Sequence, residues 1–286
     1  MKLCIFDDGR IGVVRDETVY DVTPIVNRLP ASRYGDRQGD ALIGALPSLR
    51  SVIEQLAANA KGIPVRDVAL KPPVGHPGKL LAAPGNYQDH LDEARAEPET
   101  FAVAQVRRIH EMGFFLKATS SLAGCSDGIT LSRVDRRTDH EIELALIIGR
   151  RCRGVTRQAA LDFITGYCIG LDITLRGPEE RSLRKSIDTY SVLGPYLVTS
   201  DELGDPSSLS LSLDVNGEAR QRANTRDLII DVPGLIEFAS AWYTLEPGDV
   251  IFTGTPAGVG PIRPGDLILA SIERIGSMKV RVHDLQ

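Results

Sequence analysis

The sequence contains no long apolar segment. Of its 286 residues, 42% are hydrophobic, yet no apolar run approaches the ~18 residues that a membrane-spanning helix requires. The start of the chain, Met1 to Val14, mixes charged and apolar residues and has no basic region followed by an apolar core, so it does not resemble a signal peptide. We therefore expect a cytoplasmic protein with no membrane partner.

Cysteines are few, and blocks of one charge are absent from the sequence. The four cysteines are widely spaced and form no C-x-x-C pair, which excludes a disulfide framework and indicates reduced thiols. Lysine and arginine number 33 against 38 aspartates and glutamates, a formal net charge of −5, and the two signs are interspersed. Because no basic stripe is present, nucleic acid is not an expected partner.

A segment rich in proline and glycine divides the chain. Residues 71–78, with the sequence KPPVGHPG, can neither pair well in a sheet nor continue a helix. We predict a domain boundary there, with a small N-terminal accessory domain over residues 1–77 and a larger domain over residues 78–286. The first domain is expected to start with a hairpin that turns at Asp8-Gly9 and to contain a helix over residues 41–60.

The larger domain is predicted to be dominated by strands. Short β-type runs separated by turn signals cover residues 142–148, 167–173, 209–215 and 250–253. One amphipathic helix is expected over residues 232–242. The fold class that these patterns favour is α+β.

Two acids stand at the start of the most apolar of these runs. Glu141 and Glu143 are two residues apart, so in a strand their side chains share a face about 6 to 7 Å apart, while Ile142 and Leu144 face the core. Two like charges at this separation are stabilised by a cation or by water. The segment therefore predicts either part of a metal site or the solvated face of an edge strand.

A third acid, Asp172, ends the apolar run that begins at Tyr167. Burying its carboxylate is costly unless it is hydrogen-bonded, paired or bound to a metal, and Arg176 is one candidate partner. The other candidate is a metal ion shared with Glu141 and Glu143. Three carboxylates without convergent Cys or His form a hard oxygen site, which suits Mg²⁺, Mn²⁺ or Ca²⁺ better than Zn²⁺.

Two further segments each have a functional and an ordinary interpretation. His90 and Glu93 are three apart on an expected helix, where the carboxylate can orient the imidazole as a general base or form a plain surface pair. Residues 254–260, GTPAGVG, follow an apolar strand and can either bring backbone N–H groups to a ligand carboxylate or form a long turn. Their glycine spacing is not that of a nucleotide-binding loop.

In their order and wording, these segments resemble the fumarylacetoacetate hydrolase family over roughly residues 80–282. Residues 86–93 carry its N-Y-x-x-H-x-x-E pattern, and residues 115–121 are similar to its F-x-K-P-x-S-S motif, with Ala118 in place of proline. Asp172 and Arg176 match D-x-x-x-R, and residues 185–189 resemble K-S-F-D-T. The resemblance implies a mixed β-sandwich roll with a small N-terminal α+β domain, assembled as a homodimer.

The resemblance also implies a role for each matching residue. Glu141, Glu143 and Asp172 would hold Mg²⁺ or Mn²⁺. His90 would activate water with help from Glu93. The remaining implied roles are catalysis by Lys185 and substrate binding by Tyr87, Lys117, Arg176, Glu179, Gly254 and Thr255.

The chain departs from the family between Arg176 and Lys185, where the loop is shorter and Glu179 replaces the usual glutamine. An ionised glutamate only accepts hydrogen bonds and adds negative charge. If Glu179 faces the pocket, we expect it to repel a second substrate carboxylate and to favour monocarboxylic substrates. The alternative is that it faces solvent or pairs with Arg181 or Arg184.

These residues predict an enzyme acting on a small 2-oxo acid. A hard cation chelated by two oxygens of the substrate would stabilise the enolate that leaves when a C–C bond breaks, as in hydrolysis of an acylpyruvate or fumarylpyruvate. The alternative within the family is a decarboxylase or isomerase acting on a compound of the oxaloacetate or 2-hydroxyhepta-2,4-diene-1,7-dioate type. A different class is a binding or structural protein without turnover. Intact His90 and Glu93 favour hydrolysis.

Overall fold

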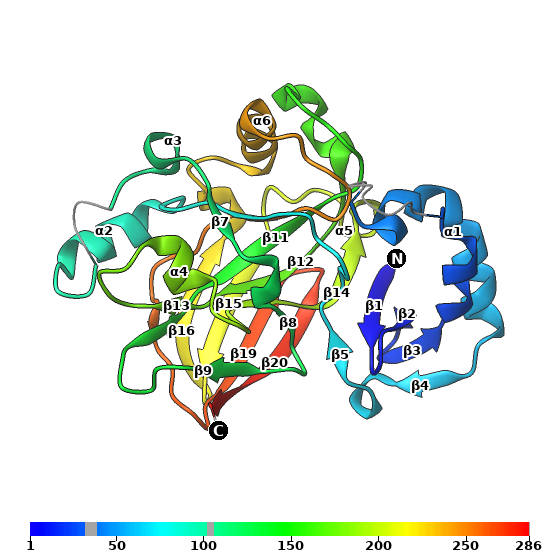
Figure 1. The fold of residues 1–286 in the computed structure, drawn as a ribbon, viewed down its shortest axis with the longest axis horizontal. Coiled ribbons are helices and arrows are strands. Elements are labelled where there is room, and N and C mark those ends of the chain that lie inside the picture. Colours follow the sequence, from blue (N-terminus) through cyan, green and yellow to red (C-terminus); the bar gives the residue numbers. More distant parts are fainter. Residues whose placement is uncertain (32–38, 102–105, 286) are drawn as a thin grey trace.

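The computed structural model describes residues 1–31, 39–101 and 106–285, and strands form most of its framework (Figure 1). The described strands lie in a twelve-stranded, a five-stranded and a three-stranded sheet. The strands are β1 (Lys2–Phe6), β2 (Arg10–Arg15), β3 (Thr18–Asp21), β4 (Gly62–Pro64), β5 (Leu70–Lys71), β6 (Leu80–Ala82), β7 (Phe115–Lys117), β8 (Leu122–Gly124), β9 (Ile129–Leu131), β10 (Thr138–His140), β11 (Ile142–Ile148), β12 (Ile164–Asp172), β13 (Thr174–Leu175), β14 (Ser191–Thr199), β15 (Ser210–Val215), β16 (Glu218–Asn224), β17 (Val250–Phe252), β18 (Gly260–Pro261), β19 (Leu267–Ile272) and β20 (Gly276–Asp284).

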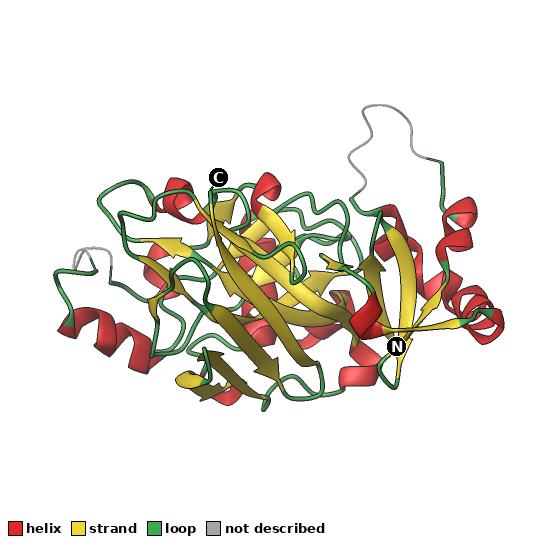
Figure 2. Cartoon of the chain, turned by 90° about the horizontal axis from the view of Figure 1, so that it is seen from below, coloured by secondary structure: helices red, strands yellow, loops and turns green. Residues whose placement is uncertain are grey.

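Helices lie mainly at the periphery, while the strands cross the middle of the molecule (Figure 2). The α-helices are α1 (Ala41–Asn59), α2 (Gln88–Ala96), α3 (Ile109–Met112), α4 (Arg181–Lys185), α5 (Ser200–Leu203) and α6 (Val232–Trp242). Short 3-10 helices are η1 (Thr23–Arg28), η2 (Val65–Asp67), η4 (Thr119–Ser121), η5 (Arg157–Phe163) and η6 (Thr225–Asp227).

The large sheet has the order β4-β3-β2-β1-β14-β12-β11-β17-β6-β7, with β5 beside β1 and β8 beside β14. Its central strands β11 and β12 are antiparallel, with Ile142 opposite Leu171 and Leu144 opposite Ile169. Every residue of β11 is buried. Such a strand needs apolar side chains on both faces, which explains why all its residues except Glu143 are apolar.

Two hydrophobic cores cover the two faces of the large sheet. Alternate residues of β11, such as Ile142 and Leu144, belong to the core that also contains Leu213 and Ile268 of the five-stranded sheet β16-β15-β19-β20-β9. The intervening residues of β11, including Ala145, pack in a second core with side chains of α1. The predicted strand-dominated α+β fold is confirmed, and its two sheets sandwich the first core.

The N-terminal segment joins the large sheet instead of standing apart from it. The predicted hairpin is formed by β1 and β2, and β1 pairs with β14, with Leu3 opposite Leu197. The expectation that residues 71–78 do not pair in a sheet is wrong for Lys71. This residue belongs to β5 and lies opposite Ile5 of β1. The division into domains 1–77 and 78–286 stays a prediction.

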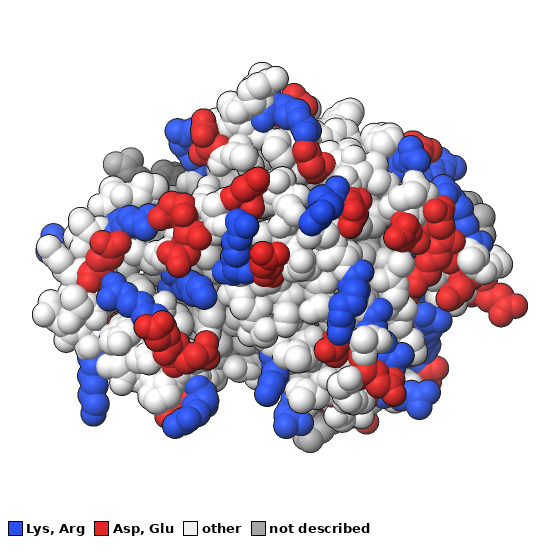
Figure 3. Space-filling view, turned by 180° about the vertical axis from the view of Figure 1, so that it is seen from behind, with Lys and Arg blue, Asp and Glu red and all other residues white. Residues whose placement is uncertain are grey.

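The predicted helices form close to their expected limits. α1 begins after Asp40, whose side chain accepts hydrogen bonds from the backbone N–H groups of Leu42 and Ile43 at 3.0 and 3.1 Å. α6 covers the predicted residues 232–242, and Asp231 caps it through Gly234 N at 3.1 Å. In the described part of the chain, none of the helices is long and apolar enough to cross a membrane. Side chains of both charges are interspersed on the face shown in Figure 3.

Candidate active site and metal centre

Two acids reach the site from β11. Glu141 directly precedes the strand and Glu143 is its second residue, so both side chains lie on the face of the sheet that carries Ala145. Glu141 is 4% exposed and Glu143 is 2% exposed. The alternative of a solvated edge strand is wrong, because β11 lies between β12 and β17.

Asp172 completes the group of acids from the neighbouring strand. It is the last residue of β12, and its backbone N–H donates to the carbonyl oxygen of Glu141 at 2.9 Å. One carboxylate oxygen from each of Glu141, Glu143 and Asp172 lies within 4.8 Å of the others. The strand pairing therefore brings the predicted metal-binding acids together.

Cations surround two of these acids, and the sequence analysis named only Arg176 as a possible partner. Lys185 Nζ donates to Glu141 Oε2 and Asp172 Oδ2, both at 2.7 Å, and Lys117 also donates to Asp172. Arg176, the predicted partner of Asp172, instead donates to Asp139 Oδ2 at 2.7 Å and to Glu141 Oε1 at 2.9 Å. Although burial opposes it, Lys185 and Arg176 hold the pKa of Glu141 below its usual range.

Glu143 is the acid of this group that lacks a cationic partner among the described residues. The backbone N–H of Gly254 donates to its Oε2 at 2.5 Å, and no side chain of the described part forms an ion pair with it. Burial, followed by the charges of Asp172 and Glu141, raises the pKa of the Glu143 carboxyl well above its usual value. A divalent cation between the acids would remove this penalty, so the residues fit such an ion.

His90 and Glu93 form the predicted pair on α2. His90 Nδ1 lies 2.9 Å from Glu93 Oε2, and Glu93 Oε1 accepts from the backbone N–H of Gly258 at 2.8 Å. An ionised Glu93 can only accept, so in the neutral imidazole Nδ1 carries the proton and Nε2 keeps its lone pair. The rings of Phe101 and His90 are nearly perpendicular, with their centroids 6.0 Å apart. Because the His90 side chain is only 13% exposed, the alternative of an ordinary surface pair does not describe it.

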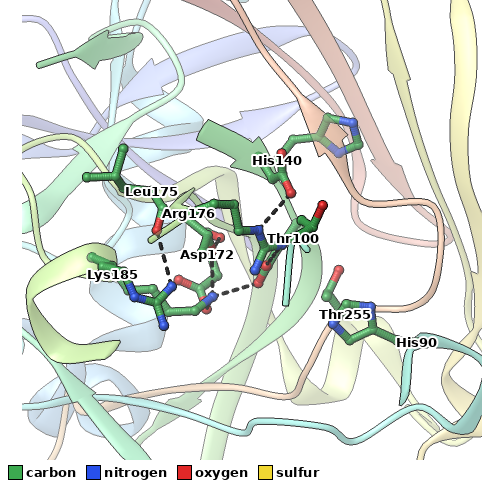
Figure 4. A network of polar contacts seen from close by, with 12 residues as sticks. His90, Thr100, His140, Asp172, Leu175, Arg176, Lys185 and Thr255 are labelled. Carbon is green, nitrogen blue, oxygen red and sulfur yellow. Dashed lines mark hydrogen bonds and ion pairs between the residues drawn. The ribbon is translucent and has the colours of Figure 1, made fainter. Parts of the chain in front are cut away.

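One cavity brings these groups together. It has about 770 Å³ of empty volume, including its opening to solvent. Figure 4 shows His90 beside Thr255, with Lys185, Asp172 and Leu175 on the other side of the view. The predicted site residues in the cavity wall are His90, Glu141, Glu143, Asp172, Arg176, Lys185 and Thr255.

Several wall residues were not predicted. Ala94, Thr100, Phe101, Val106 and Arg107 contribute to the wall, which places part of the segment 94–112 at the cavity. Residues 102–105 of that segment lie outside the described residues. Arg181 and Arg184 also line the cavity, and the density of arginines before Lys185 was the available signal.

Two backbone N–H groups of the glycine-rich segment donate to carboxylates of the chain itself, and its role toward a ligand stays a prediction. The N–H groups of Gly254 and Gly258 donate to Glu143 and Glu93, respectively. Both glycines have positive φ, and a Cβ on Gly258 would lie 2.1 Å from the carbonyl oxygen of Arg220. The segment therefore fixes the positions of the Glu143 and Glu93 carboxylates.

Thr255 is oriented by a residue that sequence reasoning missed. Gln221 of β16 donates to Thr255 Oγ1 and to the carbonyl oxygen of Pro256, both at 2.8 Å. Thr255 in turn donates to the carbonyl oxygen of Ile142 at 2.9 Å. Gln221 is far away in the sequence, and no local motif marked it.

Three residues that were predicted to bind substrate do not line the cavity. Tyr87 is buried in the core and bridges to Leu228. Lys117 is fully buried behind Asp172 and also donates to the carbonyl oxygen of Tyr190 at 2.7 Å. Like Gly254, these residues can support the site but are not among the residues that line its cavity.

Glu179 is also outside the cavity wall. Its carboxylate accepts two hydrogen bonds from Arg136, at 2.7 and 2.8 Å, and this pair lowers the pKa of Glu179 to about 2. The condition for repelling a second substrate carboxylate is thus not met. The alternative prediction, that Glu179 pairs with Arg181 or Arg184, is also wrong. The side-chain partner of Glu179 is Arg136.

We expect the Glu179→Gln variant to keep the relative activity of the protein toward mono- and dicarboxylic substrates. Glutamine can preserve a contact with Arg136, and the side chain does not face the substrate. The measurement is the ratio of kcat/KM for fumarylpyruvate to kcat/KM for acetylpyruvate in both proteins. A change of tenfold or more, about 1.4 kcal/mol, would contradict this placement of Glu179.

Comparison with known proteins agrees with this arrangement. The family model described as fumarylacetoacetate (FAA) hydrolase C-terminal matches residues 79–283. The chain belongs to the fumarylacetoacetate hydrolase family. The family assignment made from motifs is therefore confirmed.

Several proteins are similar to this chain over its whole length. A maleylpyruvate hydrolase from Aquipseudomonas alcaligenes is 51% identical over 287 residues, covering 100% of both chains. The crystal structure of a maleylpyruvate hydrolase from Sphingobium sp. SYK-6, in complex with manganese(II) and pyruvate, has a TM-score of 0.85 at 40% identity and full coverage of both chains. A probable 2-hydroxyhepta-2,4-diene-1,7-dioate isomerase from Mycobacterium abscessus has a TM-score of 0.78 at 28% identity, again with full coverage of both chains.

Proposed function

We propose that the protein is a metal-dependent hydrolase that cleaves a C–C bond in an acylpyruvate. The observation that carries this proposal is the placement of an oriented imidazole, His90, in the same cavity wall as Glu141, Glu143 and Asp172. The similarity to maleylpyruvate hydrolases supports a substrate of this class.

The acids Glu141, Glu143 and Asp172 would hold the ion. Mg²⁺ and Mn²⁺ both accept carboxylate oxygens, and the Sphingobium relative contains manganese. When bound, the ion would draw negative charge from the 2-oxo acid and stabilise the enolate that leaves.

His90 would act as the general base. Its Nε2 lone pair can take a proton from water, while Glu93 stabilises the positive charge that develops on the ring. The resulting hydroxide adds to the C4 carbonyl of R–CO–CH₂–CO–COO⁻. Breaking the C3–C4 bond then gives R–COO⁻ and the pyruvate enolate, which takes up a proton at C3.

Lys185 and Arg176 would bind oxygens of the substrate that carry negative charge. Both present cationic groups at the cavity wall beside Glu141. Such preorganised donors stabilise the negative charge that develops on an enolate oxygen. Thr255, held by Gln221, adds an oriented hydroxyl.

The second candidate is isomerisation of a 2-hydroxyhepta-2,4-diene-1,7-dioate-type compound. The Mycobacterium abscessus neighbour favours it, since the folds agree over both whole chains. Isomerisation needs proton transfer but no water attack. The His90–Glu93 pair, which suits water activation, favours hydrolysis. Decarboxylation of oxaloacetate remains a third outcome of the test below.

A product analysis tests the proposal. The chelated protein is supplied with Mg²⁺ or Mn²⁺ and offered acetylpyruvate, fumarylpyruvate, oxaloacetate and 2-hydroxyhepta-2,4-diene-1,7-dioate. We expect pyruvate and a carboxylic acid in equal amounts from the acylpyruvates. Release of CO₂ from oxaloacetate, or a shifted double bond in the diene, without any acylpyruvate cleavage would replace hydrolysis by the corresponding alternative.

The homodimer and the cytoplasmic location stay predictions. We propose the dimer because of the family and the apolar, strand-rich larger domain. Sedimentation of the protein at micromolar concentration as a 31.1 kDa monomer would contradict it.

A further inference from the structure

Arg184 is a buried cation without a carboxylate partner in the described part of the chain. The residue is 7% exposed and lines the cavity. Its Nε donates to the carbonyl oxygen of Glu179 at 2.8 Å and its Nη1 to that of Leu175 at 3.1 Å. Both acceptors are neutral, so its charge is solvated but not neutralised, which is costly for a buried ion.

The neighbouring charges increase this cost. Burial and then the charges of Arg176 and Arg181 lower the pKa of Arg184, and the opposing charges of Glu141 and Glu179 have smaller effects. By contrast, Arg176 in the same wall is neutralised by Asp139 and Glu141. The excess of positive charge is therefore concentrated at Arg184 and would attract an anion.

Helix α4 places these cations along the cavity. Arg181 and Lys185 are one turn apart on the same face, and both lie 5.4 Å from the centre of the Phe115 ring. Lys185 is engaged by the acids Glu141 and Asp172. In the proposed function, the ion held by the acids, together with Arg176 and Lys185, would bind the first carboxylate and the 2-oxo group of the substrate, and none of these contacts involves Arg184.

We propose that Arg184, assisted by Arg181, forms a second anion subsite that binds a distal carboxylate of the substrate. The protein then selects dicarboxylic 2,4-dioxo acids over monocarboxylic ones. This inference rests on the proposed function for its substrate, but the subsite itself can be tested by binding alone. This preference for dicarboxylic substrates is the opposite of the one expected if Glu179 faced the pocket.

The test compares the affinities of 2-oxopimelate and 2-oxoheptanoate by calorimetry on Mg²⁺-loaded protein. The two compounds have the same carbon chain and differ in the distal carboxylate, and neither has the 4-oxo group that hydrolysis requires. We expect the wild type to bind 2-oxopimelate roughly 10- to 100-fold more tightly, the range for a charged hydrogen-bonded contact. Arg184→Gln should reduce this ratio to near one.

Two variants separate recognition from a structural role. Arg184→Lys keeps the charge and should retain part of the ratio even if Arg184→Gln folds poorly. Arg50→Gln removes a partly exposed arginine of α1 that pairs with Asp201 away from the cavity, and it should keep the full ratio. If Arg184 only holds the backbone at Leu175 and Glu179, both affinities fall together and the ratio is unchanged, which overturns the proposal.

The outcomes also distinguish this inference from the proposed hydrolysis. Discrimination between the two ligands that is lost in Arg184→Gln supports the subsite even if no acylpyruvate is cleaved. Equal affinities in the wild type refute the subsite even if acylpyruvates are cleaved.

Discussion

Glu143→Ala is expected to lower turnover by roughly 10³-fold or more, because a metal ligand contributes several kcal/mol of charge stabilisation in the transition state. Glu143 is a cleaner target than Glu141, whose removal leaves Lys185 and Arg176 buried without their partner. Glu141→Ala should also abolish turnover, but with a loss of stability. The measurements are the rate of pyruvate release and the calorimetric affinity for Mn²⁺.

A second readout separates metal binding from folding. In chelator at neutral pH, the free energy of unfolding of Glu143→Gln should equal or exceed that of the wild type. The raised pKa means that ionised Glu143 destabilises the fold as pH rises, and glutamine removes this repulsion. The exposed Glu218→Ala serves as the control and should bind Mn²⁺ like the wild type. An unchanged Mn²⁺ affinity in Glu143→Ala would exclude this acid as a ligand.

His90→Ala is expected to lower kcat by roughly 10² to 10⁴-fold, the usual contribution of a general base. The imidazole does not belong to the acid cluster, so Mn²⁺ affinity and binding of 2-oxo acids should be retained. Glu93→Gln keeps the shape of the pair but removes its charge, and should lower kcat by a smaller factor. An acylpyruvate hydrolysed by His90→Ala at the wild-type rate would show that another group activates the water.

Local sequence patterns were sufficient for most of the framework. The apolar run of β11 and the capped, amphipathic α6 formed over their predicted residues, because both signals lie within the elements themselves. The shared face of Glu141 and Glu143 followed from strand alternation. The family resemblance implied that Asp172 lies close to Glu141 and Glu143. In the structure, the pairing of β11 with β12 produces this proximity.

Long-range pairings could not be derived from these patterns. The partner of Glu179 is Arg136, whose loop approaches only in the folded chain, and the orientation of Thr255 depends on Gln221 of another sheet. From the sequence, Arg184 was expected only as a possible partner of Glu179. Its contacts with two backbone carbonyl groups, and with no carboxylate of the described residues, can be seen only in the folded chain. The charges that a substrate meets in this site thus depend on contacts between residues far apart in the sequence.

The most direct test of the account is a titration of Mn²⁺ into the chelated protein during turnover of an acylpyruvate. Pyruvate and the second acid are quantified together with bound metal. The account predicts no cleavage without metal, and equal amounts of both products at a rate that rises with occupancy until Glu141, Glu143 and Asp172 hold one ion per chain. Full-rate pyruvate release by the metal-free protein would contradict it.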